Sequence, residues 1–352
     1  MLRTTIGLCL LFALSCTLAQ TAQNGDSTLY RGQQLPAGEI ITTIALGSCN
    51  KQNKSQHIWP HIARQQPDLW IWLGDNIYGD TEDMAVMKAK YLKQKNHPEY
   101  RAFTEVVPVI GIWDDHDYGA NDGGKEYPKR AESQHLLLDF LDVPPDAGAR
   151  NRPGAYQAYT FGPVGKRVKI MLLDTRYFRD SLEKNPAEGP RYFPNEKGDL
   201  LGEAQWKWLE GELRNSEAQV HLLATSIQFI AEEHFFEKWA NFPRARRRML
   251  DLLARTRPAN PLFLSGDRHI AELSRMEVPS LDRPLYELTA SGMTHTWRKS
   301  WNTDEPNRHR VGELLIAKNF GLIHIDWSGA EPDLRVEVRS DKGESLMEFR
   351  IQ

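Results

Sequence analysis

The sequence predicts an α/β fold with a metal site at the ends of its strands. Short apolar runs bounded by glycine and charged residues alternate with segments whose apolar spacing suits helices. Three acid-rich segments each follow such a run, at residues 73–78, 113–117 and 265–269. Ligands gather where strands of an α/β sheet end, so we expect the polar side chains of these segments to converge. These side chains are Asp75, Asp115, Asp267 and His269. Carboxylates withdrawn from water repel one another, so cations must share the space.

Short apolar runs along the first three quarters of the chain are predicted to be core strands. They span residues 40–46, 69–73, 107–113, 168–173, 220–225 and 261–265. The segments between them that can bury one helical face are Asp83–Lys95, Lys129–Leu141, Glu203–Arg214 and Glu237–Arg255. From Asn319 onward the pattern changes to alternating runs at 320–327, 334–339 and 346–351, separated by turn residues. This pattern predicts an antiparallel meander that closes the sheet.

The composition is that of a globular α/β protein. With 352 residues, of which 40% are hydrophobic and 26% charged, the chain can bury a large core. We find no internal repeat, low-complexity segment or long linker, so we predict a single domain over residues 38–352. Two long irregular stretches, Glu183–Gly202 and Met293–Gly312, are expected to form rims or lids, since compact domains seldom keep such loops without a use.

The first residues have the layout of a secretory signal peptide. Arg3 precedes an apolar stretch at residues 6–14, and small residues follow. We predict that residues 1–19 are a signal peptide and that the protein is exported, to the periplasm or beyond. Lipidation at Cys16 is the alternative, although Ala13 stands where a lipoprotein motif usually has Leu. A bilayer span takes about 20 apolar residues, so we expect no transmembrane segment in the mature chain.

Charge and cysteine content narrow the function classes further. The formal net charge of −3 shows no basic excess, so we expect no nucleic-acid-binding module. Cys9 and Cys16 lie in or beside the leader, which leaves Cys49 as the one thiol well inside the mature chain. Cys49 follows the predicted strand 40–46 directly, and this position favours a chemical role over that of an inert buried thiol.

The segments resemble, in their order, the motifs of the calcineurin-like metallophosphoesterases and, within them, the PhoD-like (alkaline phosphatase D) family. Residues 74–78 have Tyr78 where the superfamily has a second Asp, and Cys49 replaces its first Asp-x-His; both are features of PhoD-like members. Residues 114–117, Asp-Asp-His-Asp, and 266–269, Gly-Asp-Arg-His, match the third and last motifs. The resemblance covers roughly residues 40–300.

This resemblance implies a four-layer α/β/β/α sandwich with a site for two or more metal ions at the strand ends. The implied ligands are Cys49, Tyr78 and His269 for the first metal, Asp115 and Asp267 for the second, and Asp75 as the bridge between them. Gln228 lies where the superfamily supplies a further contact to the second metal or the substrate. Thiolate, phenolate and imidazole suit iron, and oxygen ligands suit calcium, with manganese or magnesium as alternatives.

The resemblance also implies hydrolysis of a phosphate ester by a metal-bound hydroxide. His116 would stand near the leaving group as proton donor, with Asp117 orienting it. Arg176, which follows the run 168–173, would clamp phosphate oxygens, with Arg268 as the alternative clamp. Without such a role, Arg176 would pair with a nearby carboxylate, Asp174 or Asp180.

The function predicted from the sequence is therefore that of an exported, metal-dependent phosphoric ester hydrolase acting on phosphodiesters or phosphomonoesters. A phospholipase D-like phosphodiesterase that cleaves lipid headgroups is one alternative. A non-catalytic, cation-binding surface module is another. His116 argues against this last alternative, because a structural cation site has no need of an imidazole beside it.

Overall fold

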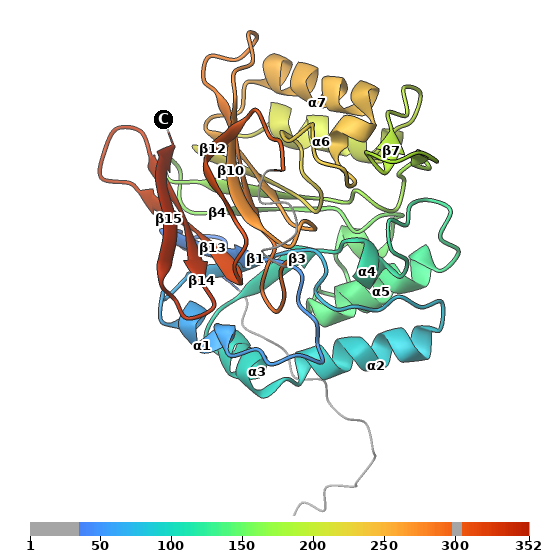
Figure 1. Ribbon diagram of the computed structural model, residues 1–352. Coiled ribbons are helices and arrows are strands. Elements are labelled where there is room, and N and C mark those ends of the chain that lie inside the picture. The colour runs from blue at the N-terminus through green and yellow to red at the C-terminus, as the bar shows by residue number, and fades with distance from the viewer. Residues whose placement is uncertain (1–34, 298–304, 352) are drawn as a thin grey trace, which may run out of the picture. The chain divides into compact units, whose positions relative to one another are not determined.

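The computed structural model describes residues 35–297 and 305–351, which form two large mixed β-sheets with helices on their outer faces (Figure 1). The predicted signal peptide and Cys16 lie outside these residues, as does part of the predicted loop 293–312. Among the described helices, none combines the length and the apolar character that crossing a bilayer requires. The predicted single domain over residues 38–352 stays a prediction.

The first sheet has six strands in the described part of the chain, ordered β15-β14-β13-β1-β2-β3. Its parallel half consists of β1 (Thr43–Gly47), β2 (Leu69–Leu73) and β3 (Val109–Ile112). Its antiparallel half consists of β13 (Asn319–Asp326), β14 (Asp333–Ser340) and β15 (Ser345–Ile351). The predicted C-terminal meander is therefore confirmed, and β13 joins it to β1.

The second sheet has seven strands among the described residues, ordered β12-β10-β11-β9-β8-β5-β4. Its parallel strands are β5 (Val168–Leu173), β8 (Val220–Thr225), β9 (Pro261–Ser265) and β11 (Leu285–Ala290). Its antiparallel strands are β4 (Gln157–Phe161), β10 (Ala271–Met276) and β12 (Arg310–Leu315). A separate short pair is formed by β6 (Glu183–Lys184) and β7 (Tyr192–Phe193) within the predicted loop 183–202.

The helices lie outside the two sheets (Figure 1). On the side of the first sheet are α1 (Ile58–Ala63), α2 (Met84–Lys95), α3 (Pro98–Thr104), α4 (Asp115–Tyr118) and α5 (Arg130–Phe140). On the side of the second sheet are α6 (Gly202–Arg214) and α7 (Pro243–Thr256). Short 3₁₀ turns occur at η1 (Gly148–Arg150) and η2 (Trp239–Asn241). The predicted α/β/β/α sandwich is confirmed.

One predicted helix begins later than expected. The apolar spacing predicts a helix from Glu237, whereas α7 begins at Pro243. Proline is well suited to the first helical position, because its N–H is missing where no helical partner exists and its φ is already helical. Glu237 is thereby left outside the helix, where its carboxylate pairs with two buried arginines.

An aromatic cluster fixes the first sheet against its helices. Trp70 and Trp72 of β2 lie 5.0 and 5.3 Å from the ring of Trp59 in α1, in edge-on arrangements that aromatic rings favour. All three rings are buried. The buried tryptophans thus hold β2 in register, and the first acidic motif lies at its end.

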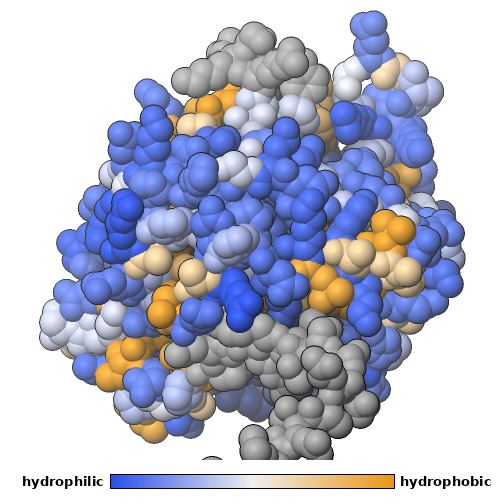
Figure 2. All heavy atoms as spheres, turned by 90° about the horizontal axis from the view of Figure 1, so that it is seen from below, coloured by the Kyte–Doolittle hydropathy of each residue, from blue (hydrophilic) through white to orange (hydrophobic). Residues whose placement is uncertain are grey.

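The outward surface seen from below is mostly hydrophilic, with apolar side chains scattered over it (Figure 2).

The carboxyl ends of the parallel strands in the two sheets lie next to one another, and we call this place the shared strand edge. Backbone hydrogen bonds connect the loops that follow these strands. Met293 N–H, after β11, donates to the carbonyl of Ser48, after β1, at 3.2 Å. Gly266 N–H donates to the carbonyl of Ser226 at 2.8 Å. Gly74, after β2, has φ of 95°, and a Cβ placed on it would lie 2.4 Å from the Cβ of Asp114. Glycine at this position therefore lets two acidic loops approach closely.

We expect Gly74→Ala to lower the free energy of unfolding by about 2 kcal/mol or more, from backbone strain and the contact with Asp114. Gly211→Ala in α6 is the matched control, since nothing lies within 4 Å of an added Cβ there. It should stabilise by about 0.5–1 kcal/mol, because alanine has the higher helix propensity. Urea denaturation of both variants tests this. Equal effects of the two changes would contradict the close approach.

Candidate metal centre

Three overlapping groups of side chains at the shared strand edge are arranged to hold cations. The groups are Cys49, Asp75 and His269; Asp75, Asp115 and His116; and Asp114, Asp115 and Asp267. Within each group the candidate ligand atoms lie within 4.8 Å of one another. The structure thus brings together side chains from the ends of β1, β2, β3 and β9, so the two sheets contribute to one site. Asp75 belongs to two of the groups, in line with its predicted bridging position.

The backbone at this site adopts an uncommon conformation. Cys49, Asp75, Asp267 and His269 have φ values of 61°, 51°, 66° and 55°. Non-glycine residues seldom occupy this left-handed region, and each such residue costs about 1–3 kcal/mol. A sharp reversal directly after a strand turns each of these side chains to the common edge. The clustering of left-handed residues at one point is typical of functional sites.

The surrounding side chains balance the charges of this cluster only in part. Burial acts to raise the pKa of Asp115, but His116 and Arg176 outweigh it and lower that pKa. Burial and neighbouring carboxylates raise the pKa of Asp75 and of Asp267 well above the usual range. Burial, with Asp75 next in effect, likewise raises the pKa of the Cys49 thiol. Burial, with a smaller contribution from Asp115 and with Arg176 opposing it, raises the pKa of Asp114 to about 7. Acids that resist ionisation in this way gain from an added positive charge.

The donor atoms fit bound metal ions. Asp115 Oδ1 and Asp114 Oδ2 are buried and have no hydrogen-bond partner among the described residues, although buried polar atoms are generally paired. Burial lowers the pKa of His269 well below its usual value, which leaves the imidazole neutral and able to donate a lone pair. A thiol and an imidazole beside several carboxylates suit a transition metal and a harder cation side by side.

Tyr78 links the candidate ligands to a histidine that the motifs do not identify. Its hydroxyl lies 3.0 Å from Nε2 of His269 and 3.0 Å from Nε2 of His295. His295 follows β11, and Thr294 N–H beside it donates to the carbonyl of Cys49 at 3.4 Å. Only its place in the predicted loop 293–312 pointed to a site residue here. The start of that loop lies at the metal centre.

His116 is half-buried beside Asp75 and Asp115, and its ring contacts a third carboxylate, that of Asp80. Its Nδ1 lies 2.6 Å from Oδ1 of Asp80. Burial lowers its pKa, but the carboxylates of Asp75, Asp115 and Asp80 outweigh this and raise it to about 11. The imidazole is thus held by Asp80, a residue beyond the Gly-Asp motif that sequence spacing gave no reason to select.

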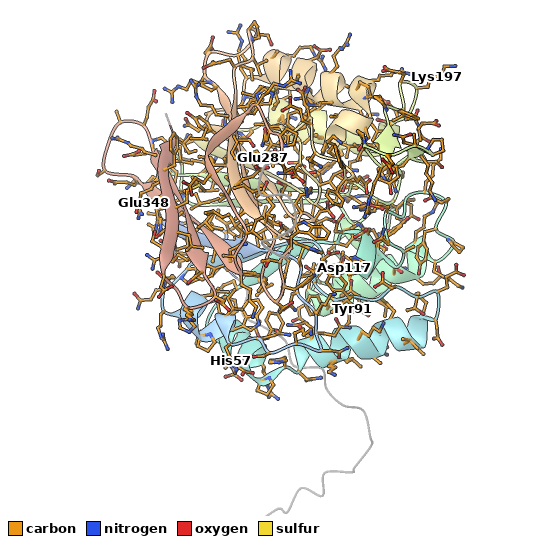
Figure 3. The ribbon with its side chains drawn as sticks, in the orientation of Figure 1. His57, Tyr91, Asp117, Lys197, Glu287 and Glu348 are labelled. Carbon is orange, nitrogen blue, oxygen red and sulfur yellow. The ribbon has the colours of Figure 1, made fainter. Side chains whose placement is uncertain are left out.

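Asp117 has a structural environment, and its predicted role in orienting His116 stays a prediction. Its carboxylate accepts hydrogen bonds from the backbone N–H groups of Asp75, Asn76 and Asp114 and from the Asn76 side chain, at 2.6–3.2 Å. It is fully buried, and Figure 3 shows Tyr91 of α2 beneath it. These bonds commit the carboxylate to fixing the two acidic loops relative to each other.

Arg176 and Arg268 are both paired with carboxylates, and their predicted role as phosphate clamps stays a prediction. Arg176 is 0% exposed, with Nε 2.6 Å from Asp114 Oδ1 and Nη1 2.5 Å from Glu237 Oε2. Arg268 is 1% exposed, and its Nη2 contacts both oxygens of Glu305, at 2.6 and 2.7 Å. Buried guanidiniums need such partners, and sequence order did not indicate that Asp114 and Glu237 would supply them.

Gln228, after β8, is fully buried at the same edge of the second sheet. Its amide nitrogen donates to Glu272 at 2.7 Å and to Thr289 at 2.9 Å. Its carbonyl oxygen has no hydrogen-bond partner among the described residues. The amide is therefore fixed in one orientation, and its predicted contact with a metal or substrate stays a prediction.

Comparison with known proteins identifies the family. The model of the PhoD-like phosphatase family matches residues 44–328. This chain belongs to that family. Family membership supports a phosphoric ester hydrolase, and the match covers every residue of the candidate metal centre described above.

Individual relatives agree with this assignment. Alkaline phosphatase D of Bacillus subtilis (strain 168) is 25% identical, over 67% of this chain and 47% of the relative. The chain therefore spans about half the length of that protein. The structure of PhoD has a TM-score of 0.70 at 19% identity, covering 91% of this chain and 70% of that one. A purple acid phosphatase from yellow lupin (Lupinus luteus) seeds has a TM-score of 0.58 at 13% identity, covering 90% and 55%. Both structures support the shared fold.

Added metal should stabilise this PhoD-like protein through Asp75. We expect Mn²⁺ or Ca²⁺ to raise the unfolding temperature about 5 °C or more above that of chelator-treated protein, since ligands of the folded state stabilise it by mass action. Asp75→Asn should lose most of this rise, because two candidate ligand groups lose their shared carboxylate. Scanning calorimetry measures the shift. Asp251→Asn on the exposed face of α7 is the control, and an equal loss there would refute the assignment.

Proposed function

We propose that this chain is an exported, metal-dependent phosphoric ester hydrolase that cleaves phosphomonoesters or phosphodiesters. The observation that carries the proposal is the convergence of Cys49, Asp75, Asp115, Asp267 and His269 at one strand edge. Buried carboxylates with too little positive charge around them lower stability, and so do non-glycine residues in the left-handed conformation. Stability alone therefore gives no reason for the fold to keep them together. The proposed removal of residues 1–19 on export would be checked by the N-terminal sequence of the secreted protein.

In this proposal the metal ligands are those implied by the sequence. Cys49, Tyr78 and His269 would hold a first ion, Asp115 and Asp267 a second, and Asp75 would contact both; iron and calcium suit the two donor sets. Such a pair of ions, when bound, supplies a nucleophile near neutral pH and neutralises charge on the phosphoryl group. The chain would therefore provide a fixed, strained set of donors that needs little rearrangement on binding.

His116 is proposed to deliver a proton to the leaving group. Its Nδ1 is committed to Asp80, so Nε2 is the atom left to face a substrate. Its backbone N–H contacts Asp75 Oδ1 at 3.4 Å, which places the imidazole beside the candidate ligands. A proton donor must lie within hydrogen-bond reach of the atom it protonates, and a fixed ring satisfies this at low entropic cost. Asp80 would act as the positioning residue.

Arg176 and Asp117 are proposed to support the site from beneath. Arg176 neutralises Asp114, and Asp117 ties the backbone of the loop after β2 to that of the loop after β3. Positioning of this kind matters because small displacements of reacting groups cost large factors in rate. Direct contact of Arg176 with phosphate is not part of the proposal.

Hydrolysis of p-nitrophenyl phosphate and of bis(p-nitrophenyl) phosphate tests the function. We expect the metal-loaded mature protein to cleave at least one of them, with Asp75→Asn reducing the rate a hundredfold or more, in the range typical of a lost catalytic group. The ratio of the two rates separates monoester from diester preference. Absence of cleavage with iron, calcium and manganese supplied would contradict the proposal.

We further expect His116→Gln to lower kcat about 10²–10⁴-fold while metal content stays the same, because general acid catalysis typically contributes this factor. Asp80→Asn should lower kcat by a smaller factor and leave KM within about twofold, since it alters the orientation of a proton donor. His57→Gln is the control, as His57 is exposed and remote from the site. A non-catalytic cation-binding module would show no difference between His116→Gln and this control.

A further inference from the structure

A second feature beside the metal centre is an apolar pocket of about 260 Å³. Its apolar lining is formed by Phe235, Phe236, Ile270, Trp297, Leu314 and Ile316. These residues come from the loop after β8, the start of β10, the loop after β11 and the end of β12. None of them belongs to the candidate ligand set, and the proposed hydrolysis does not yet use the pocket.

The pocket lies next to the candidate metal ligand His269. Ile270 directly follows His269 in the chain and lies in the pocket lining. The ring of Trp297 is 5.1 Å from the imidazole of His269 and stacks on Phe236 at 5.2 Å. One aromatic wall of the pocket, Trp297, therefore lies against a candidate metal ligand.

The polar residues around the pocket are paired with each other. Glu305 is the single acidic residue in the described lining, and Arg268 contacts both of its oxygens, at 2.6 and 2.7 Å. Arg268 also lies 4.4 Å from the centre of the Phe236 ring, and Arg191 lies 4.7 Å from it. These contacts hold the aromatic wall and leave Glu305 neutralised. Charge in the pocket therefore gives no preference for a charged ligand.

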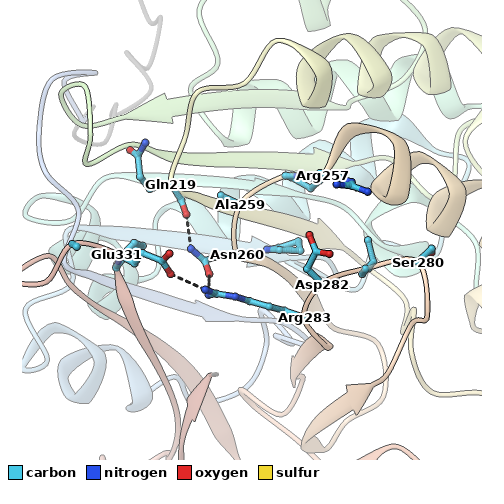
Figure 4. A pocket seen from close by; sticks show the side chains of 13 residues that line it. Gln219, Arg257, Ala259, Asn260, Ser280, Asp282, Arg283 and Glu331 are labelled. Carbon is cyan, nitrogen blue, oxygen red and sulfur yellow. Dashed lines mark hydrogen bonds and ion pairs between the residues drawn. The ribbon is translucent and has the colours of Figure 1, made fainter.

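A larger pocket, of about 310 Å³, is a poor candidate for the same role. It lies at the opposite strand ends, where Gln219 and Asn260 precede β8 and β9 (Figure 4). Arg283 there is paired with Glu331 at 2.7 Å and with Asn260 at 3.0 Å. Its position is remote from the metal centre, and its residue Arg283 is already paired.

We propose that the pocket beside His269 binds a compact apolar group, such as an aryl ring, of the phosphate ester whose phosphoryl group lies at the metal centre. The size is appropriate, because an apolar cavity of about 150 Å³ already accommodates benzene. Burial of an aromatic ring gives a large hydrophobic gain, which would make aryl-bearing esters the preferred substrates. This inference rests on the proposed function for the phosphoryl contact and adds the class of its organic group.

The test is calorimetric titration of the metal-loaded protein with methylphosphonate and with benzylphosphonate, which share a headgroup and resist hydrolysis. Benzylphosphonate should bind about tenfold more tightly or better, as expected for a buried ring. Leu314→Asn should bring the ratio of the two affinities close to one, because it places an amide in the apolar lining. Phe235→Ser is the second pocket variant, chosen because Phe235 is 45% exposed and its loss should spare folding.

Leu346→Asn is the matched control, since Leu346 lies on the edge strand β15 of the other sheet and is 36% exposed. It should leave the affinity ratio as in the wild type. Equal affinities in the wild type, or an equal loss in the control, would overturn the inference. A ratio that falls as protein concentration rises would place a second copy of this chain in the pocket and would also overturn it.

The assay with p-nitrophenyl esters, run on the same samples, separates this inference from the proposed function. Hydrolysis without a preference for benzylphosphonate would leave the function standing and remove the aryl pocket. Selective binding of benzylphosphonate without hydrolysis would support the pocket and remove the hydrolase proposal. Loss of both would overturn both.

Discussion

The architecture depends on one electrostatic constraint, the convergence of carboxylates and a thiol at a single strand edge. Burial raises the pKa of Asp75, Asp267 and Cys49, so the fold holds groups that oppose their own ionisation. The backbone nevertheless adopts the left-handed conformation at these positions, which costs about 1–3 kcal/mol of stability for each residue. Bound cations would relieve the repulsion, and the binding free energy would then contribute to folding.

Buried polar contacts surround this cluster and hold its loops in place. Arg176 bridges Asp114 and Glu237, while Asp117 accepts four hydrogen bonds from the two neighbouring acidic loops. Removal of one partner from such a network leaves a buried charge or a set of unpaired donors. The rigidity of the site therefore comes from residues that do not themselves face a substrate. His116, held by the half-exposed Asp80, lies at the boundary between this layer and solvent.

The two sheets contribute different properties to the site. The first sheet supplies Cys49, Asp75 and Asp115 from strands fixed by the tryptophan cluster. The second sheet supplies His269 and the adjacent Ile270, while strand β12 and the loops after β8 and β11 supply the rest of the apolar lining. In the turn after β9, the candidate metal ligand His269 is thus followed directly by Ile270, which lines the apolar pocket. This juxtaposition links the chemistry of a phosphoryl group to recognition of the group attached to it.

The sequence by itself determined which strand ends hold the candidate metal ligands. Apolar runs predicted β2, β5, β8 and β9 because their strands are buried on both faces, and the motifs after β1, β2, β3 and β9 identified Cys49, Asp75, Asp115 and His269. Strands β10 and β12 contain charged residues in an interrupted alternation, so their pattern was not recognised. Only the tertiary structure decided that Asp80 positions His116 and that Arg176 and Arg268 pair with Asp114 and Glu305. Pairing of this kind depends on distances between residues 36–62 positions apart, which the linear order of residues does not specify.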